Sequence, residues 1–257
     1  MRVRSLMLAA AGIALVAPTV LPGAAPTPGP GPGPAEGEGN GNARAGHVPG
    51  TGHGPGARKT HGTRTVRAAE LLNAVRDCAP VSGDRYRSDD GEPADIDICG
   101  GRDAVFWKAD MDIDCDGRPG PHCNERTDPL FSAATAYQQS DGRELSAEQL
   151  PYVVLPAPSH RWDHHEHGIR RGTVAAVVHG DRVRYAVVGD IGPEDIIGEG
   201  SYALARDLGI RSDPRGGGAP SGVTYILFKN SAASPIESPG AAAAEGERLA
   251  RAFVGRS

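Results

Sequence analysis

The 257-residue chain contains few lysines, and after its N-terminal segment it lacks any long apolar run. Residues 65–257 have Lys108 and Lys229 as their only lysines. The whole chain has a formal charge of −5, to which residues 1–64 contribute +4 through six Arg or Lys and two Glu, so the rest carries −9. An acidic surface of this kind repels nucleic acid and favours cationic partners. A bilayer span needs about 20 apolar residues, so none is expected in this part of the chain.

The N-terminus has the layout of a secretory signal peptide. Arg2 and Arg4 precede an apolar run over residues 6–21, and small residues follow it. The run is short for a membrane span and contains Pro18. We predict a signal peptide at residues 1–25, and hence a secreted, extracellular protein that makes no membrane contact after export.

Cysteine is scarce, and no C-x-x-C pair occurs. The spacings of the four cysteines do not fit a zinc site, and outside the cell an even number of cysteines indicates disulfides. Three pairings are possible for four cysteines. We predict Cys78–Cys99 together with Cys115–Cys123.

Residues 26–62 are rich in Pro, Gly, Ala, Asn and His and have hardly any large apolar side chain. Such a segment cannot bury enough surface to offset its ordering entropy, so we expect a disordered linker. Residues 63–257 are then one domain, which is long enough to bury a substantial core.

Four aspartates alternate with apolar residues over residues 110–116. In a strand, alternation would place Met111, Ile113 and Cys115 on one face. The opposite face would carry Asp110, Asp112, Asp114 and Asp116. Such carboxylates repel one another unless a cation lies among them, and a protonated amino sugar or calcium would serve. A typical calcium loop is not expected, because loop position twelve is Cys123 instead of Glu. A solvated acidic strand is the third alternative.

Residues 159–168 contain four histidines and two acids, with Trp162 among them. The segment fits a surface loop near a cleft, or a sugar contact in which the flat Trp162 ring stacks on a pyranose. A zinc site is the third alternative, although no helical pair at positions i and i+4 supports it. We predict no metal.

Residues 185–202 place two carboxylates on rigid supports. Tyr185–Val188 reads as a buried strand that ends at Asp190, and Glu199 precedes an expected helix over residues 200–208. Glycoside hydrolysis needs two such acids, because one protonates the leaving oxygen and the other activates water or attacks the sugar. The alternative is a purely structural role, in which Asp190 is a turn residue and Glu199 is favoured at a helix start by the helix dipole.

The runs Val187–Pro193 and Ile197–Tyr202 resemble the catalytic region of glycoside hydrolase family 75, the endo-chitosanases. Asp110–Gly117 and Tyr152–Pro156 are similar to this family as well, so the resemblance covers residues 67 to about 230. It implies an inverting endo-chitosanase that cleaves internal β-1,4 links of chitosan without a cofactor. Chitosan, a cationic polymer of glucosamine, suits the acidic domain. We expect a monomer.

The resemblance also implies roles for residues. Asp190 and Glu199 are the essential pair, and we expect Glu199 to be the acid and Asp190 the base. The four aspartates of residues 110–116 are expected to hold the amino sugars near the cleft, together with Trp162 and Tyr202 as further substrate contacts.

Six or so short strands and a few short helices make the predicted fold mainly β (α+β). The Gly180–Asp181 turn between apolar runs predicts a hairpin over residues 173–188. Other expected strands cover residues 96–99, 104–107, 152–155 and 223–228, and expected helices cover residues 65–78, 200–208 and 241–254. The family resemblance implies a six-stranded double-psi β-barrel with peripheral short helices.

Two other functions fit the same acids. One is a non-hydrolytic polysaccharide-binding or wall-loosening protein, which would release no reducing ends. The other is a lytic transglycosylase in which Asp190 acts alone, Glu199 is dispensable, and an anhydro product forms.

Overall fold

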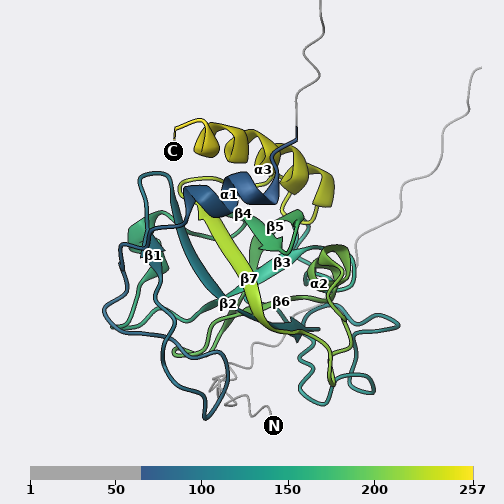
Figure 1. The fold of residues 1–257 in the computed structure, drawn as a ribbon. Helices are drawn as coiled ribbons and strands as arrows, with labels where there is room; N and C mark the ends of the chain where they lie inside the picture. The colour runs from purple at the N-terminus through teal and green to yellow at the C-terminus, as the bar shows by residue number, and fades with distance from the viewer. Residues whose placement is uncertain (1–64, 257) are drawn as a thin grey trace, which may run out of the picture. The chain divides into compact units, whose positions relative to one another are not determined.

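The computed structural model describes residues 65–256, which form a closed β-barrel with helices packed on its outside (Figure 1). The predicted signal peptide at residues 1–25 and linker at residues 26–62 lie outside the described residues, so both stay predictions. No helix among residues 65–256 combines the length and the apolar character that a membrane crossing needs.

Six strands close the barrel in the order β2-β6-β3-β5-β4-β7, and β7 pairs back onto β2. Two of the six neighbouring pairs are parallel, β2 with β6 and β3 with β5. The expected six-stranded double-psi barrel with peripheral short helices is thus confirmed as a closed six-stranded barrel. The short β1 adds to the edge of β2. The strands are β1 (Cys99–Gly100), β2 (Ala104–Asp114), β3 (Tyr152–Pro156), β4 (Val174–His179), β5 (Arg182–Gly192), β6 (Glu199–Ser201) and β7 (Ala219–Phe228).

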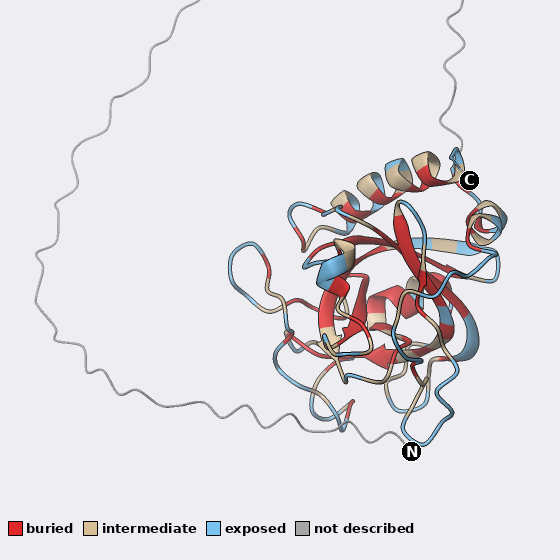
Figure 2. Ribbon diagram, turned by 90° about the vertical axis from the view of Figure 1, so that its left-hand side faces the viewer, coloured by how far each residue is buried: buried red, intermediate tan, exposed pale blue. Residues whose placement is uncertain are grey.

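Side-chain alternation divides the core into two clusters. One fills the barrel, where Trp107 of β2 stacks on Tyr225 of β7 with ring centroids 5.2 Å apart. The other lies between the outer face of the strands and the helices, and in Figure 2 the strands are largely buried. The helices are α1 (Ala68–Ala74), the 3-10 helix η1 (His164–His167), α2 (Tyr202–Leu208) and α3 (Pro239–Val254).

The C-terminal helix α3 covers the outer face of the barrel. Ser238 caps its first turn by accepting a hydrogen bond from the main-chain N–H of Ala241 (3.1 Å), and Pro239 occupies the first turn. Glu247 accepts a hydrogen bond from the Tyr185 hydroxyl (2.8 Å), and Phe253 packs edge-on against Phe228. The predicted terminal helix and the predicted hairpin of β4 and β5 are therefore confirmed.

Both predicted disulfides are present, Cys78–Cys99 and Cys115–Cys123. The first joins the segment after α1 to β1. The second closes the loop that follows β2, so it fixes the chain at the C-terminal end of the acidic run.

Two details of the predicted acidic strand are wrong, its length and the place of Cys115. β2 does not end at residue 107 but continues to Asp114, because it is held between β7 and β6. The predicted alternation itself holds along β2, because Met111 and Ile113 pack in the barrel cluster and Asp110, Asp112 and Asp114 lie on the opposite face. The register shift between Ala109 and Met111 places its extra residues on β7, between Ala219 and Val223. Cys115 lies past the strand end and packs in the outer cluster, away from Met111 and Ile113 in the barrel.

Candidate active site

Asp190 and Glu199 lie on opposite sides of the same residue of β3. Val154 is the partner of Asp190 on β5 and also of Glu199 on β6. Paired residues point to the same face of a sheet, so both carboxylates project from the outer face of the barrel. Neighbouring strands are ~4.8 Å apart, which separates the Cα atoms of the two acids by roughly 10 Å across β3.

A bulge aims Asp190 at this face. The register between β3 and β5 shifts after Val153, which pairs with Val188, because Val154 then pairs with Asp190 and Gly189 is the extra residue. A Cβ atom at Gly189 would lie 2.7 Å from the Tyr152 side chain, so only glycine fits at the bulge.

Glu199 belongs to the three-residue strand β6, and α2 begins only at Tyr202. The expectation that Glu199 opens the helix is therefore wrong. The main chain of β6 lies between β2 and β3, where Glu199 pairs with Asp112 on one side and Val154 on the other. Gly198, with φ of +118°, turns the chain into β6, and its missing side chain leaves room for the Asp110 carboxylate.

Asp190 is almost completely buried, with 6% of its surface exposed. Its Oδ1 atom accepts hydrogen bonds from the main-chain N–H groups of Ala136 (2.7 Å) and Ile191 (2.8 Å). Burial above all, and then the negative charge of Asp114, raise the pKa of Asp190 to about 8; the two N–H groups oppose this rise, and the charge of Asp116 adds to it.

The loop that supplies the Ala136 N–H group is held by Glu144. The Glu144 carboxylate accepts hydrogen bonds from the main-chain N–H (2.9 Å) and the hydroxyl (3.1 Å) of Thr135. The same loop contacts the acidic run, because the N–H of Ser132 donates to Asp116 (2.9 Å). The surroundings of Asp190 are therefore fixed by a segment more than 40 residues before it in the chain.

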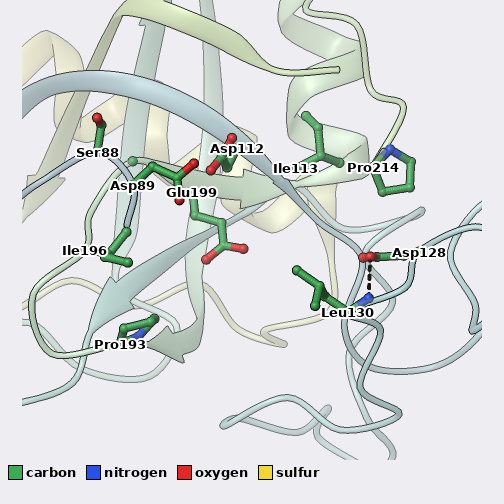
Figure 3. Close-up of a pocket in the computed structure, with 11 residues that line it drawn as sticks. Ser88, Asp89, Asp112, Ile113, Asp128, Leu130, Pro193, Ile196, Glu199 and Pro214 are labelled. Carbon is green, nitrogen blue, oxygen red and sulfur yellow. Dashed lines mark hydrogen bonds between the residues drawn. The ribbon is translucent and has the colours of Figure 1, made fainter. Parts of the chain in front are cut away.

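Glu199 faces a pocket, which we call the acidic pocket. Figure 3 shows its carboxylate among residues of β2 and of the surrounding loops. Gly192 lies beside it, since a Cβ atom there would be 3.6 Å from Glu199 Oε2. All the charged side chains that line the acidic pocket are carboxylates, namely Asp89, Asp112, Asp128 and Glu199.

Comparison with known proteins places this site within a recognised family. Residues 111–253 match the family described as fungal chitosanase of glycosyl hydrolase group 75. The match covers more than half of the chain and includes both acids and the strands that hold them. The chain belongs to glycosyl hydrolase group 75.

Curated relatives of this family come from Aspergillus. The chain is 30% identical over 142 residues to an endo-chitosanase of Aspergillus oryzae (strain ATCC 42149 / RIB 40), a match that covers 51% of this chain and 58% of that protein. It is 31% identical over 134 residues to an endo-chitosanase of Aspergillus fumigatus, a match that covers 49% of this chain and 56% of that protein. It is 30% identical over 129 residues to endo-chitosanase C of Aspergillus oryzae, a match that covers 49% of this chain and 31% of that protein. The matches thus span from 31% to 58% of the length of these relatives.

The other predicted substrate contacts lie in different surroundings. Asp112 lines the acidic pocket, whereas Asp114 and Asp116 are buried beside Asp190. The Asp110 side chain packs against Gly198, beneath the strand that carries Glu199. Asp110 and Asp112 thus lie near Glu199, whereas Asp114 and Asp116 lie near Asp190.

The prediction that Trp162 stacks on a sugar is wrong. Only 3% of its surface is exposed, and its ring packs in the barrel cluster and against His164 and His167. Tyr202 does not line the acidic pocket, but a second pocket next to it. The polar composition around Trp162 gave no sign that its ring packs in the barrel cluster.

Two residues that line the acidic pocket were not predicted from the sequence. Asp128 is 6% exposed and accepts the main-chain N–H of Leu130 (2.9 Å; Figure 3), and Asp89 comes from a loop near the start of the domain. Both lie in polar loops without periodicity, so no pattern marked them.

Two groups of side chains in residues 65–256 could hold a cation. One is Asp114, Asp116 and Asp190, whose carboxylate oxygens lie within 4.8 Å of one another. Carboxylates alone suit a hard divalent cation or an ammonium group. The other is Asp163, His164 and His165. Since His165 Nδ1 already contacts Asp163 Oδ1 at 2.8 Å, a metal would have to displace this hydrogen bond.

Proposed function

We propose that this domain hydrolyses internal β-1,4 links of chitosan, with Asp190 and Glu199 as the catalytic pair. The observation that carries the proposal is the pairing of both acids with Val154. One intervening strand gives a separation of roughly 10 Å between the Cα atoms. Inverting glycosidases hold their carboxyl groups about 6.5–9.5 Å apart, and retaining enzymes only about 5–5.5 Å, so the geometry supports inversion.

The division of labour follows from which acid carries the proton. With a pKa of about 8, Asp190 is protonated in mild acid, the state that a general acid needs. Both main-chain N–H groups bind its Oδ1 atom, so the proton belongs on Oδ2. Glu199, in the open pocket, then acts as the base. This assignment reverses the one expected from the sequence.

In the proposed reaction, Asp190 gives its proton to the oxygen of the leaving sugar as the glycosidic bond breaks. Glu199 takes a proton from a water molecule, whose oxygen attacks the anomeric carbon from the opposite face. The products are two shorter chains, and the new reducing end has the α configuration. This chemistry requires no cofactor.

The choice of chitosan is supported by charge. The acidic pocket presents four carboxylates and no cationic side chain, so it attracts the protonated amines of glucosamine units. The names of the Aspergillus relatives agree with this substrate. The two disulfides fit an oxidising compartment, and we propose a secreted monomer.

The test is to incubate the purified full chain with chitosan, chitin and peptidoglycan, and to identify the products by mass. We expect new reducing ends from chitosan and a mixture of oligomers, as an endo-acting enzyme gives. Anhydro products from peptidoglycan would indicate a lytic transglycosylase. Binding of chitosan without any new reducing ends would indicate a non-hydrolytic binder. Either result would contradict the proposal.

A further inference from the structure

A second pocket adjoins the acidic pocket and has the opposite charge; we call it the arginine pocket. Its volume is about 790 Å³. Pro214 lines both pockets, so they are contiguous. The charged groups of the arginine pocket, apart from His122, are Arg126, Arg206, Arg211, Asp213 and Arg215.

Two of these arginines are neutralised locally. Arg211 forms a salt bridge with Asp213 (2.7 Å), and Arg206 forms one with Asp207 (2.9 Å). Their net contribution to the charge of the pocket is therefore small.

The other two arginines leave the pocket positive. Within residues 65–256, neither Arg126 nor Arg215 forms a salt bridge with a carboxylate. Arg215 is nevertheless held in place, because its guanidinium donates to the main-chain carbonyls of Thr127 (3.0 Å) and Arg126. In a domain of strongly negative formal charge, these two positive charges stand directly beside the substrate pocket.

An aromatic pair lines the same pocket. The rings of His122 and Tyr202 stack with centroids 5.3 Å apart and planes inclined by 8°. The main-chain N–H groups of His122 and Cys123 both donate to Glu148 (2.6 and 2.7 Å), and the Cys115–Cys123 disulfide ties this segment to the end of β2. The pair is thus a fixed, flat surface of the kind on which a pyranose ring packs.

We propose that the arginine pocket is a subsite for an N-acetylglucosamine unit of partially acetylated chitosan, and that Arg126 and Arg215 disfavour a protonated glucosamine there. The inference rests on the proposed function. A chain that lies in the acidic pocket and crosses Pro214 brings its next units against these arginines. A protonated amine at that place meets like charge. An acetamide is neutral, and its carbonyl oxygen accepts a guanidinium N–H.

The experiment is to digest partially acetylated chitosan with the full chain at low salt and to sequence both product ends by tandem mass spectrometry. We expect one of the two newly formed ends to be enriched in N-acetylglucosamine over the substrate average. Arg126→Glu should reduce this enrichment about threefold, as expected for an exposed charge, and added salt should reduce the difference. The variant should fold, because the Arg126 side chain is exposed and its contact with Arg215 is made by the main-chain carbonyl, which the substitution keeps.

Arg248→Glu, on the exposed side of α3, is the matched control and should leave the product ends unchanged. Random acetylation at both new ends in the wild type would overturn the inference, and so would an enrichment that Arg126→Glu leaves intact. If no chitosan is cleaved, the proposed function fails and this inference fails with it. Cleavage with random ends overturns the inference alone.

Discussion

The two pockets on either side of Pro214 differ in charge and in how that charge is held. The acidic pocket gathers carboxylates from β2, β6 and two loops, whereas the arginine pocket is lined mainly by loop residues and α2. Glu199 lies on a strand that is paired on both sides, with Asp112 of β2 and Val154 of β3, so its position is fixed by the barrel. In our proposal, the barrel strands position the catalytic carboxylates, and the loops discriminate between glucosamine and N-acetylglucosamine units.

The largest effect should come from the acids themselves. Asp190→Asn and Glu199→Gln should each lower chitosan hydrolysis by about 10³-fold or more, because each removes one proton transfer of a two-acid mechanism. Reducing-end assays measure this. Asp181→Asn, in the exposed hairpin turn, and Glu245→Gln, on α3, are matched controls that should keep full activity. Near-normal turnover in either catalytic variant would refute its role.

The buried Asp190 side chain should also make the folded state less stable as pH rises. Its pKa is about 8 in the folded state and near 4 when unfolded, so the folded state binds more protons between these values. The wild type therefore loses stability as pH rises through this window. Asp190→Asn lacks the titration but keeps an oxygen for both N–H donors.

Thermal unfolding of the two proteins tests this. The melting temperatures should be similar at pH 4, and at pH 8 Asp190→Asn should melt roughly 5 °C or more above the wild type, since ~2–5 kcal/mol is at stake. A difference that does not change with pH would mean that the environment of Asp190 does not raise its pKa.

A smaller effect should come from Glu144, which acts through Asp190. Glu144→Ala frees the loop that donates the Ala136 N–H, a hydrogen bond that opposes the rise in the pKa of Asp190. We expect about tenfold lower activity and an alkaline limb of the pH–rate profile shifted to higher pH. Glu144→Gln keeps an acceptor for Thr135 and should recover part of both effects. An unshifted limb would leave Glu144 with a merely structural role.

The smallest effect should come from a pocket acid that touches no reacting atom. Asp128→Asn removes one negative charge from the acidic pocket but can still accept the Leu130 N–H. We expect KM for chitosan to rise about threefold at low salt with kcat nearly unchanged, and salt to reduce the difference. A fall in kcat with constant KM would show that the acidic pocket does more than attract amines.

The sequence alone predicted those features whose interacting residues lie close together in the chain. The β4–β5 hairpin and both disulfides were predicted correctly, because turn residues and cysteine spacing are local signals. The strand state of Glu199 was missed, since β6 has three residues and exists only because β2 and β3 flank it. Asp128 and the burial of Trp162 were missed for the same reason, as both depend on contacts between distant loops and the barrel.

The most direct test of the account is the configuration of the first product. Proton NMR during the initial turnover of chitosan oligomers distinguishes the α and β anomers before they equilibrate. Because one strand separates Asp190 from Glu199, the account predicts that the α anomer forms first. Initial formation of the β anomer would mean that the two acids do not act as an inverting pair.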